Sequence, residues 1–379
     1  MTRSDPRDGG RLGVTGRIAL VTSTMEGGGA QRAVAKLASG IAAAGHDVDL
    51  VLGRAEGPYL AEVEPEVRVV DLGVRRFAGA TLPLARYLRR ARPVAVFSAL
   101  DYVNVVAVVA RRLSGVDTRL VVSERNTLSE VASHSRRLST RCMPSLVRWA
   151  YPRADAVAAV SRGVADDLVE HCGLAAGTVR VLPNPVVTPE LQRMRAEPVT
   201  HPWLRDKSVP VVLAVGRMVP QKDFALLLEA FAVVRRTTAA RLVLIGEGPL
   251  RRELEGLAET LGIAGDVSMP GFSANPYPAM AAADVFVLSS RWEGSPGVLI
   301  EAVSCGTRAV ATDCPSGPRE VLADGRYGRL VPVGDAAALA AGVCDALDGR
   351  VPRPPRESWS PYDRATAVTA CLDLLAVVA

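Results

Sequence analysis

Two glutamates in the second half of the chain are spaced so that both carboxylates could face one ligand. Glu293 and Glu301 lie eight residues apart, with Gly294 and Gly297 between them, directly after the apolar run Val285–Leu288. That run predicts a buried strand, so Glu293 falls in the following loop and Gly297 starts a helix. Carboxylates can accept hydrogen bonds from vicinal hydroxyls, and the amides of a helix start can approach a diphosphate. A loop glutamate and an unrelated helix-surface glutamate remain the alternative.

Two cations follow another predicted strand, Val211–Val215. Arg217 and Lys222 come shortly after it, and Lys222 is one of only three lysines in a chain that otherwise uses arginine. A fixed pair of cations at a strand end can bind an anionic group. A retained lysine favours a position that needs a compact point charge. An ordinary surface arginine and lysine are the alternative.

A glycine-rich turn, Gly27–Gly29, follows the apolar run Arg17–Ser23 near the N-terminus. An NAD site needs G-x-G-x-x-G and an acidic residue at the end of the second strand. This chain has GGGAQR instead, and its second predicted strand is followed by Gly53. NAD binding is therefore disfavoured. Gly28 and Gly29 either allow close approach of a ligand or only form a tight turn.

The order of apolar runs and helical patterns indicates an α/β protein with two Rossmann-like, doubly wound domains that face each other across a cleft. We expect an N-terminal domain over 1–190, with 1–16 as a flexible tail, and a C-terminal domain over 191–360. Residues 361–379 predict a helix that packs back on the N-terminal domain. The linker candidate begins at Pro183–Pro185. Ligands of such sheets bind beyond the carboxyl ends of the strands.

Composition excludes several classes of protein. The 379 residues are 49% hydrophobic and 22% charged, with a net charge of +5, which is globular and too mildly basic to imply nucleic acid. The six cysteines are scattered, so we expect reduced thiols and no metal site. Asp47 and Asp49 flank a predicted strand start, so we interpret this Asp-x-Asp as structural. The first residues lack a signal-peptide pattern and no apolar run spans a bilayer, which predicts a cytoplasmic protein with at most peripheral membrane contact.

The region after the strand candidate Leu120–Ser123 is rich in arginine. Six arginines and one acid, Glu130, occupy Arg125–Arg153, with Leu138, Leu146 and Trp149 among them. This segment is either a solvated basic face or a surface for anionic lipid headgroups or a lipid-linked phosphate acceptor.

The chain resembles glycosyltransferase family 4, whose members have the GT-B fold and a Glu-x7-Glu signature. The resemblance covers most of the chain and is specific because many short motifs recur in order. They are Gly28–Arg32, Ser123–Asn126, Ala154–Val157, Val160–Ser161, Pro183–Pro185, Gly216–Arg217 with Lys222, Ile245–Leu250, Gly271–Phe272, Glu293–Glu301, Cys314–Glu320 and Gly325–Gly328.

The resemblance implies roles for matching positions. Glu301 would hold the ribose hydroxyls and Glu293 the donor sugar, while Arg217 and Lys222 would neutralise the diphosphate. The amides near Gly297 and Val298 would bind the same group, and Gly28, Gly29, Gly246, Gly294 and Phe272 would complete the donor side. No metal or other cofactor is implied. On the acceptor side we expect Arg125, His134, Arg136 and Arg137, with Asn126 at a position where family members often have a histidine.

The function implied is retaining transfer of a hexose or N-acetylhexosamine from a UDP-sugar to a glycan or a polyprenyl-diphosphate-linked acceptor. The segment Cys314–Glu320 is similar to that of bacterial enzymes that build lipid-linked or cell-surface glycans. Three alternatives stay open: a UDP-sugar epimerase or phosphorylase, a non-catalytic nucleotide-sugar-binding protein, and, less favoured, an NAD oxidoreductase.

Overall fold

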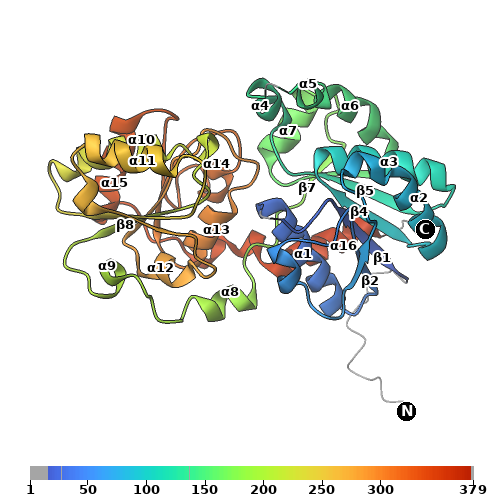
Figure 1. Ribbon diagram of the computed structural model, residues 1–379, viewed down its shortest axis with the longest axis horizontal. Helices are drawn as coiled ribbons and strands as arrows, with labels where there is room; N and C mark the ends of the chain where they lie inside the picture. The colour runs from blue at the N-terminus through green and yellow to red at the C-terminus, as the bar shows by residue number, and fades with distance from the viewer. Residues whose placement is uncertain (1–15, 27, 136, 377–379) are drawn as a thin grey trace, which may run out of the picture. The chain divides into compact units, whose positions relative to one another are not determined.

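The protein consists of two compact units, each built around its own parallel sheet (Figure 1). The computed structural model describes residues 16–26, 28–135 and 137–376. Among these, the first unit comprises 16–160, 164–185 and 364–376, and the second comprises 161–163 and 186–363. The expected two-domain α/β architecture is confirmed. The chain passes between the units after Pro185 and after Asp363, a few residues from the boundaries expected from the sequence.

The first unit has seven strands in the order β3-β2-β1-β4-β5-β6-β7, all parallel. The strands are β1 (Ile18–Thr22), β2 (Val48–Leu52), β3 (Arg68–Asp71), β4 (Ala95–Ala99), β5 (Arg119–Glu124), β6 (Ala156–Ala159) and β7 (Val179–Val181). The helices are α1 (Gly29–Ala43), α2 (Thr81–Ala91), α3 (Asp101–Ser114), α4 (Leu128–Ser133), α5 (Leu138–Arg141), α6 (Met143–Ala150), α7 (Arg162–Glu170) and α16 (Arg364–Leu375), with 3-10 turns η1 (Pro58–Glu62), η2 (Phe77–Ala80) and η3 (Tyr151–Arg153).

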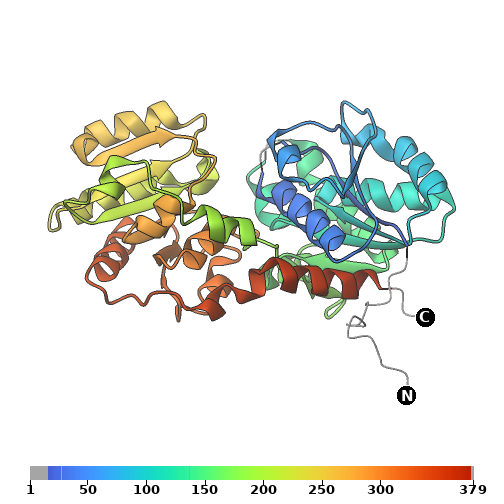
Figure 2. The same ribbon diagram turned by 90° about the horizontal axis from the view of Figure 1, so that it is seen from below.

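Both faces of the first sheet are covered, which is why its central strands are apolar throughout. Helices α2, α3, α6 and α7 bury one face, and α1 and α16 bury the other. In Figure 2 the C-terminal helix α16 lies alongside α1. Gly40 permits this contact, because a Cβ at that position would lie 2.5 Å from a methyl of Val368. The last helix of the sequence therefore completes the core of the first unit.

The second unit has six parallel strands in the order β10-β9-β8-β11-β12-β13. The strands are β8 (Val211–Val215), β9 (Arg241–Ile245), β10 (Val267–Gly271), β11 (Val285–Leu288), β12 (Arg308–Thr312) and β13 (Arg329–Val331). The helices are α8 (Pro189–Met194), α9 (Pro202–Arg205), α10 (Phe224–Arg235), α11 (Arg251–Thr260), α12 (Tyr277–Ala282), α13 (Gly297–Ser304), α14 (Pro318–Val321) and α15 (Ala336–Leu347), with η4 (Pro220–Lys222), η5 (Ala264–Asp266), η6 (Arg356–Ser358) and η7 (Ser360–Tyr362).

The strand order creates one switch point in each sheet. In the first unit the order reverses between β1 and β4, and in the second between β8 and β11. The loops that follow such a pair of strands diverge to opposite faces and leave a crevice at the carboxyl edge, where ligands of open α/β sheets bind. The motif residues around Lys222 and Glu293 follow β8 and β11, so the fold itself brings them together.

No helix among the described residues combines the length and the apolar character that crossing a membrane requires.

Candidate functional site

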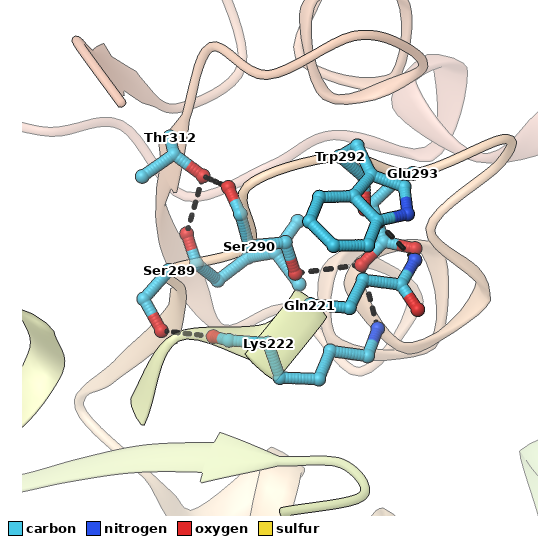
Figure 3. Close-up of polar contacts among 8 residues, drawn as sticks. Gln221, Lys222, Ser289, Ser290, Trp292, Glu293 and Thr312 are labelled. Atoms are coloured by element: carbon cyan, nitrogen blue, oxygen red, sulfur yellow. Dashed lines mark hydrogen bonds and ion pairs between the residues drawn. The ribbon is translucent and has the colours of Figure 1, made fainter. Parts of the chain in front are cut away.

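A buried ion pair lies at the switch point of the second unit. Lys222, at the end of η4, places its Nζ 2.6 Å from Oε1 of Glu293, which follows β11. The hydroxyl of Ser290 donates to the same oxygen at 2.6 Å (Figure 3). The side chains of Lys222 and Glu293 are 16% and 8% exposed. Two groups that are 71 residues apart in sequence thus form one polar centre because β8 and β11 are neighbours.

Backbone contacts hold this centre rigid. The hydroxyl of Ser289 donates to the carbonyl of Lys222 at 2.8 Å, and Gln221 Nε2 donates to the carbonyl of Trp292 at 2.8 Å. On the other side, Thr312 at the end of β12 donates to the carbonyl of Ser290 at 2.6 Å. Figure 3 shows these contacts converging on the loop after β11. The loops after three adjacent strands are therefore tied together around the ion pair.

The electrostatics favour a charged pair that is already in place before a ligand binds. In a partly desolvated site a lysine and a carboxylate in contact stabilise each other, and removing one partner leaves the other uncompensated. Burial, and to a smaller extent the charge of Glu293, raise the pKa of the adjacent Cys314 thiol to about 12, while Lys222 opposes the rise. Cys314 is therefore a neutral thiol at physiological pH and adds no charge to the site.

The loop that leads into α13 is fixed from two directions. The carbonyl of Gly294 accepts hydrogen bonds from the hydroxyls of Ser161 at 2.8 Å and Ser316 at 3.2 Å. Gly317 has a φ of +103°, and a Cβ there would lie 2.5 Å from a ring carbon of Pro296. These contacts set where α13 starts, and so where its first amides point.

Glu301 lies one turn into α13, which begins at Gly297. Its Oε1 accepts a hydrogen bond from the hydroxyl of Tyr277 of α12 at 3.2 Å. Val298 is half-buried and packs against the apolar core beneath the helix. The tyrosine orients the Glu301 carboxylate, which the spacing alone did not indicate.

Three glycines pack the neighbouring loops against each other. Gly246, with a φ of +148°, has no room for a side chain: a Cβ would lie 1.9 Å from the carbonyl oxygen of Gly216. A Cβ at Gly248 would lie 2.4 Å from the carbonyl oxygen of Met218. Gly246 thus allows the loops after β8 and β9 to pack closely against each other. Arg217, on the loop after β8, is exposed.

Phe272, expected on the donor side, follows β10 and is 78% exposed. Its position at the carboxyl edge of the second sheet agrees with the strand order, but β10 is the outermost strand and lies two strands from β8. Phe272 therefore lies on the loop after the outermost strand, at the same edge of the sheet as Lys222 and Glu293.

Gly28 and Gly29 form the start of α1 in the first unit. Gly28 is the residue before the helix, with extended backbone, and Gly29 is the first helical residue. Gly29 is exposed, and a Cβ there would meet nothing within 4 Å. Gly27, the first glycine of this turn, lies outside the described residues.

The expected acceptor-side residues separate into different environments. Arg125 is 5% exposed, donates to Oδ1 of Asn184 and lies with its guanidinium carbon 5.4 Å from the centre of the Phe97 ring. Burial lowers the pKa of Arg125 to about 10. This departs from the expectation of an acceptor contact, because the side chain points into the interior of the first unit. The neighbouring Asn126 is exposed.

His134 and Arg137 are exposed at the end of α4 and before α5. The ring Nδ1 of His134 lies 2.9 Å from the carbonyl of Glu130, the residue one turn earlier. Arg136 lies outside the described residues. These residues are therefore on the surface of the α4–α5 segment.

Sequence reasoning missed Glu124, the most buried carboxyl group near the candidate residues. Glu124 ends β5 and is 1% exposed. Burial, and to a smaller extent the like charge of Asp101, raise its pKa to about 8 against the opposing hydrogen bonds from Tyr151 and two backbone amides. The signal available in the sequence was a glutamate at the last position of a strand whose centre is apolar.

A pocket of about 230 Å³ lies at the carboxyl ends of β1, β2 and β3 in the first unit. Its walls are joined by backbone hydrogen bonds from Arg54 to Ser23 at 3.1 Å, from Met25 to Glu56 at 2.8 Å and from Val74 to Gly53 at 2.9 Å. The lining residues are Ser23, Thr24, Glu26, Gly53, Arg54, Val74, Arg75, Phe77 and Tyr102. A volume below the roughly 300–1,000 Å³ of drug-sized ligand sites suits one small polar unit.

Asp49 of the Asp-x-Asp pattern is 1% exposed inside β2. It forms an ion pair with Arg68 and accepts a hydrogen bond from the hydroxyl of Tyr87 at 2.5 Å. Within the described part of the chain, no three His, Cys, Asp or Glu side chains gather as metal ligands do. Independence from metal stays a prediction.

Comparison with known proteins assigns the family. Residues 27–189 match the model of Glycosyltransferase Family 4, and residues 209–349 match that of Glycosyl transferases group 1. The N-acetylgalactosamine-N,N'-diacetylbacillosaminyl-diphospho-undecaprenol 4-alpha-N-acetylgalactosaminyltransferase of Campylobacter jejuni is 30% identical over 343 residues, which is 88% of this chain and 90% of that protein.

Solved structures share the fold. Anabaena HepE in complex with UDP and glucose has a TM-score of 0.74 at 20% identity, and the galactosyltransferase WaaB has 0.71 at 19%; in both cases 95% of this chain and 99% of the other are covered. The chain belongs to the group 1 and family 4 glycosyltransferases of GT-B type, as the sequence motifs indicated. It is therefore a glycosyltransferase.

Proposed function

We propose that this glycosyltransferase moves a hexose or N-acetylhexosamine from a UDP-sugar to a hydroxyl of a lipid-linked glycan, with retention of configuration and without a metal. The observation that carries this proposal is the buried Lys222–Glu293 pair at the β8–β11 switch point. A cation held there can stabilise a diphosphate that gains charge as the glycosidic bond breaks. The carboxylate that orients the cation would also accept hydrogen bonds from sugar hydroxyls.

The proposed reaction breaks one bond, forms one bond and moves one proton. The bond between the anomeric carbon and the diphosphate oxygen breaks, the acceptor oxygen forms the new bond on the same face, and the acceptor proton passes to the departing diphosphate. Lys222 and the exposed Arg217 would neutralise the diphosphate, and the first amides of α13 would bind it. Glu301, oriented by Tyr277, would hold the ribose hydroxyls.

The acceptor class rests on the relatives and on the first unit. Two Campylobacter jejuni relatives, 30% and 26% identical, are named as transferring N-acetylgalactosamine to diphospho-undecaprenol-linked sugars. The pocket after β1, β2 and β3 offers hydroxyls, two arginines and the partly exposed ring of Tyr102. That mixture of an aromatic face and hydrogen-bonding groups suits an acceptor sugar or its phosphate.

A panel of UDP-sugars, each monitored for UDP release with and without a polyprenyl-diphosphate-linked N-acetylhexosamine, tests this function. We expect slow release from one donor alone and faster release with acceptor. Acceptor-stimulated release identifies a transferase, whereas binding without release would identify a non-catalytic protein. Transfer only to a soluble small molecule would overturn the lipid-linked acceptor. Unchanged turnover in both Lys222→Ala and Glu301→Ala would overturn the site.

We further propose that α5 and α6 contact the membrane that carries such an acceptor. Leu138, Leu146 and Trp149 are 74%, 43% and 44% exposed, and Arg141 and Arg148 lie on the same segment. Apolar side chains flanked by cations match an anionic bilayer surface. The protein should sediment with phosphatidylglycerol vesicles, and Leu138→Glu with Trp149→Glu should abolish this. Equal binding to neutral phosphatidylcholine vesicles would contradict the proposed role of the arginines in binding an anionic surface.

A further inference from the structure

The backbone turn after β5 is held by a single buried carboxyl group. Oε1 of Glu124 accepts hydrogen bonds from the backbone amides of Arg125 at 2.8 Å and Asn126 at 3.2 Å. Two consecutive amides that point at one oxygen fix the direction of the chain. The exposed side chain of Asn126 therefore projects from a turn whose shape depends on Glu124.

The other oxygen of Glu124 is tied to the core of the first unit. The hydroxyl of Tyr151 donates to Oε2 at 2.6 Å, and Asn104 Nδ2 donates to that hydroxyl at 2.8 Å. The hydroxyl of Ser98 in turn donates to Asn104 Oδ1 at 2.5 Å. All four side chains are buried and come from β4, α3, η3 and β5. The network links the turn to the sheet and its helices and so restricts the motion of the turn.

The far end of the turn is fixed by a different carboxylate. Oδ2 of Asp167, on α7, accepts hydrogen bonds from the amides of Leu128 at 2.7 Å and Ser129 at 3.3 Å, which are the first residues of α4. Asn126 thus sits between two anchored points, Glu124 and Asp167. Its neighbours Arg125 and Thr127 are both buried, so Asn126 is the one residue of this short turn that faces solvent.

We propose that Glu124 is a positioning residue of the transferase: it holds the Arg125–Asn126 turn in the shape that presents Asn126 to the substrate, and it holds that turn more firmly when ionised. This role rests on the proposed function. A charged acceptor forms stronger hydrogen bonds with amides than a neutral one does, so loss of the Glu124 proton tightens the turn.

Several groups around Glu124 bear on its protonation. Asp101 on α3 faces it as a like charge, Tyr151 on η3 donates to it, and Cys172 after α7 and the buried Arg125 lie within electrostatic range. Burial and Asp101 raise the pKa of Glu124 to about 8. Below that pH Glu124 is a neutral acid, and above it a carboxylate. We therefore expect the rate of transfer to rise as the pH increases through this range.

The test is the pH profile of kcat and KM from pH 6 to 9.5 for the full chain, measured as UDP release with the polyprenyl-diphosphate acceptor. Glu124→Gln keeps an oxygen for the two amides but cannot ionise. We expect its kcat to match wild type at pH 6.5 and to lack the rise, ending about five- to tenfold lower at pH 9. Glu66→Gln, an exposed glutamate of the same unit, is the matched control and should behave as wild type.

Tyr151→Phe supplies a second variant in case Glu124→Gln does not fold. Because the tyrosine hydrogen bond lowers the pKa of Glu124, its loss should move the rise to higher pH. A Glu124→Gln profile identical to wild type, or a Tyr151→Phe midpoint that does not move, overturns the role of Glu124. Absence of UDP release by wild type from every donor overturns the proposed function instead, so the two failures are distinguishable.

Discussion

At the edge where their parallel strands end, the two sheets hold glutamate side chains in opposite electrostatic settings. In the second unit, Glu293 contacts the cation of Lys222 at 2.6 Å. In the first, Glu124 lies near the like charge of Asp101, and its hydrogen-bond partners are a phenol and two amides. The first arrangement keeps a positive charge fixed for an anionic ligand. The second keeps a carboxyl group near neutrality inside the protein.

The comparison shows that the ends of parallel strands in two similar folds hold carboxyl groups in different surroundings: Glu293 follows a switch-point strand, whereas Glu124 ends β5, one strand beyond the switch point. The side chains at these strand ends decide what can be bound. Opposite charges in contact suit the diphosphate side of a transfer reaction. A buried acid that holds a backbone turn suits positioning of a neutral polar group, here Asn126. Four substitutions would sharpen or break this contrast, from the largest effect to the smallest.

Lys222→Ala should cause the largest loss. Removing the cation that meets the developing charge should lower kcat by about 10²–10³-fold, the typical cost of one preorganised stabilising group. The uncompensated Glu293 should also destabilise the second unit by about 3–5 kcal/mol. Steady-state kinetics and thermal unfolding measure the two effects. Lys207→Ala is the control, since that lysine pairs with Asp284 at the surface and should leave kcat unchanged.

Glu301→Gln should weaken donor binding more than it slows the chemical step. Loss of a charged acceptor for two hydroxyls should raise the donor KM about 10–100-fold, with a smaller change in kcat. Calorimetric titration with UDP compares the nucleotide affinities of wild type and variant without turnover. Glu259→Gln, an exposed glutamate on α11, should bind UDP as wild type does. An unchanged UDP affinity in Glu301→Gln would refute the ribose assignment.

Gly246→Ala should disturb the donor side through the backbone. The new Cβ would lie 1.9 Å from the carbonyl of Gly216, in a conformation with φ of +148°, so the loops after β8 and β9 must separate. We expect about 1–3 kcal/mol lower stability and weaker UDP binding. Gly265→Ala is the matched control, because nothing lies within 4 Å of its added Cβ. Equal stability of the two variants would argue against the close loop contact.

Glu124→Gln should have the smallest effect on the donor site, and its consequence is seen in how stability varies with pH. The folded-state pKa of Glu124 is raised from 4.5 to about 8, so the folded protein binds a proton that the unfolded chain releases above pH 4.5. This contribution is complete below pH 4.5 and is lost as the pH rises toward 8. Wild type should therefore lose more thermal stability than Glu124→Gln between pH 5 and 8. Parallel curves for the two proteins would show that Glu124 is ionised throughout.

Much of the fold followed from the sequence because the signals were local. Apolar β-branched runs separated by helical patterns predicted two parallel sheets, and both are present. The signature around Glu293 and Glu301 predicted a strand, a loop and a helix, and the structure has β11, a loop and α13. Hydrophobic periodicity indicates which residues of a segment are buried. That is enough to predict each helix and strand and their order along the chain.

The acceptor side could not be obtained in the same way. Arg125 and Asn126 are adjacent polar residues after a strand, and no local pattern distinguishes which of the two side chains points inward. The structure buries Arg125 against Phe97 and leaves Asn126 exposed. The decisive contact, with Asn184, lies 59 residues away and depends on β5, β6 and β7 being neighbours.

The sequence by itself determined the family, the two-domain α/β architecture and the residue types of the donor site. Only the tertiary structure decided which groups meet: Lys222 with Glu293, Tyr277 with Glu301, Glu124 with the turn at Asn126, and α16 with the first unit. The physical reason is that hydrophobic periodicity is encoded residue by residue, whereas the pairing of distant side chains follows from strand order. In a doubly wound sheet the neighbours at the switch point are not neighbours in sequence.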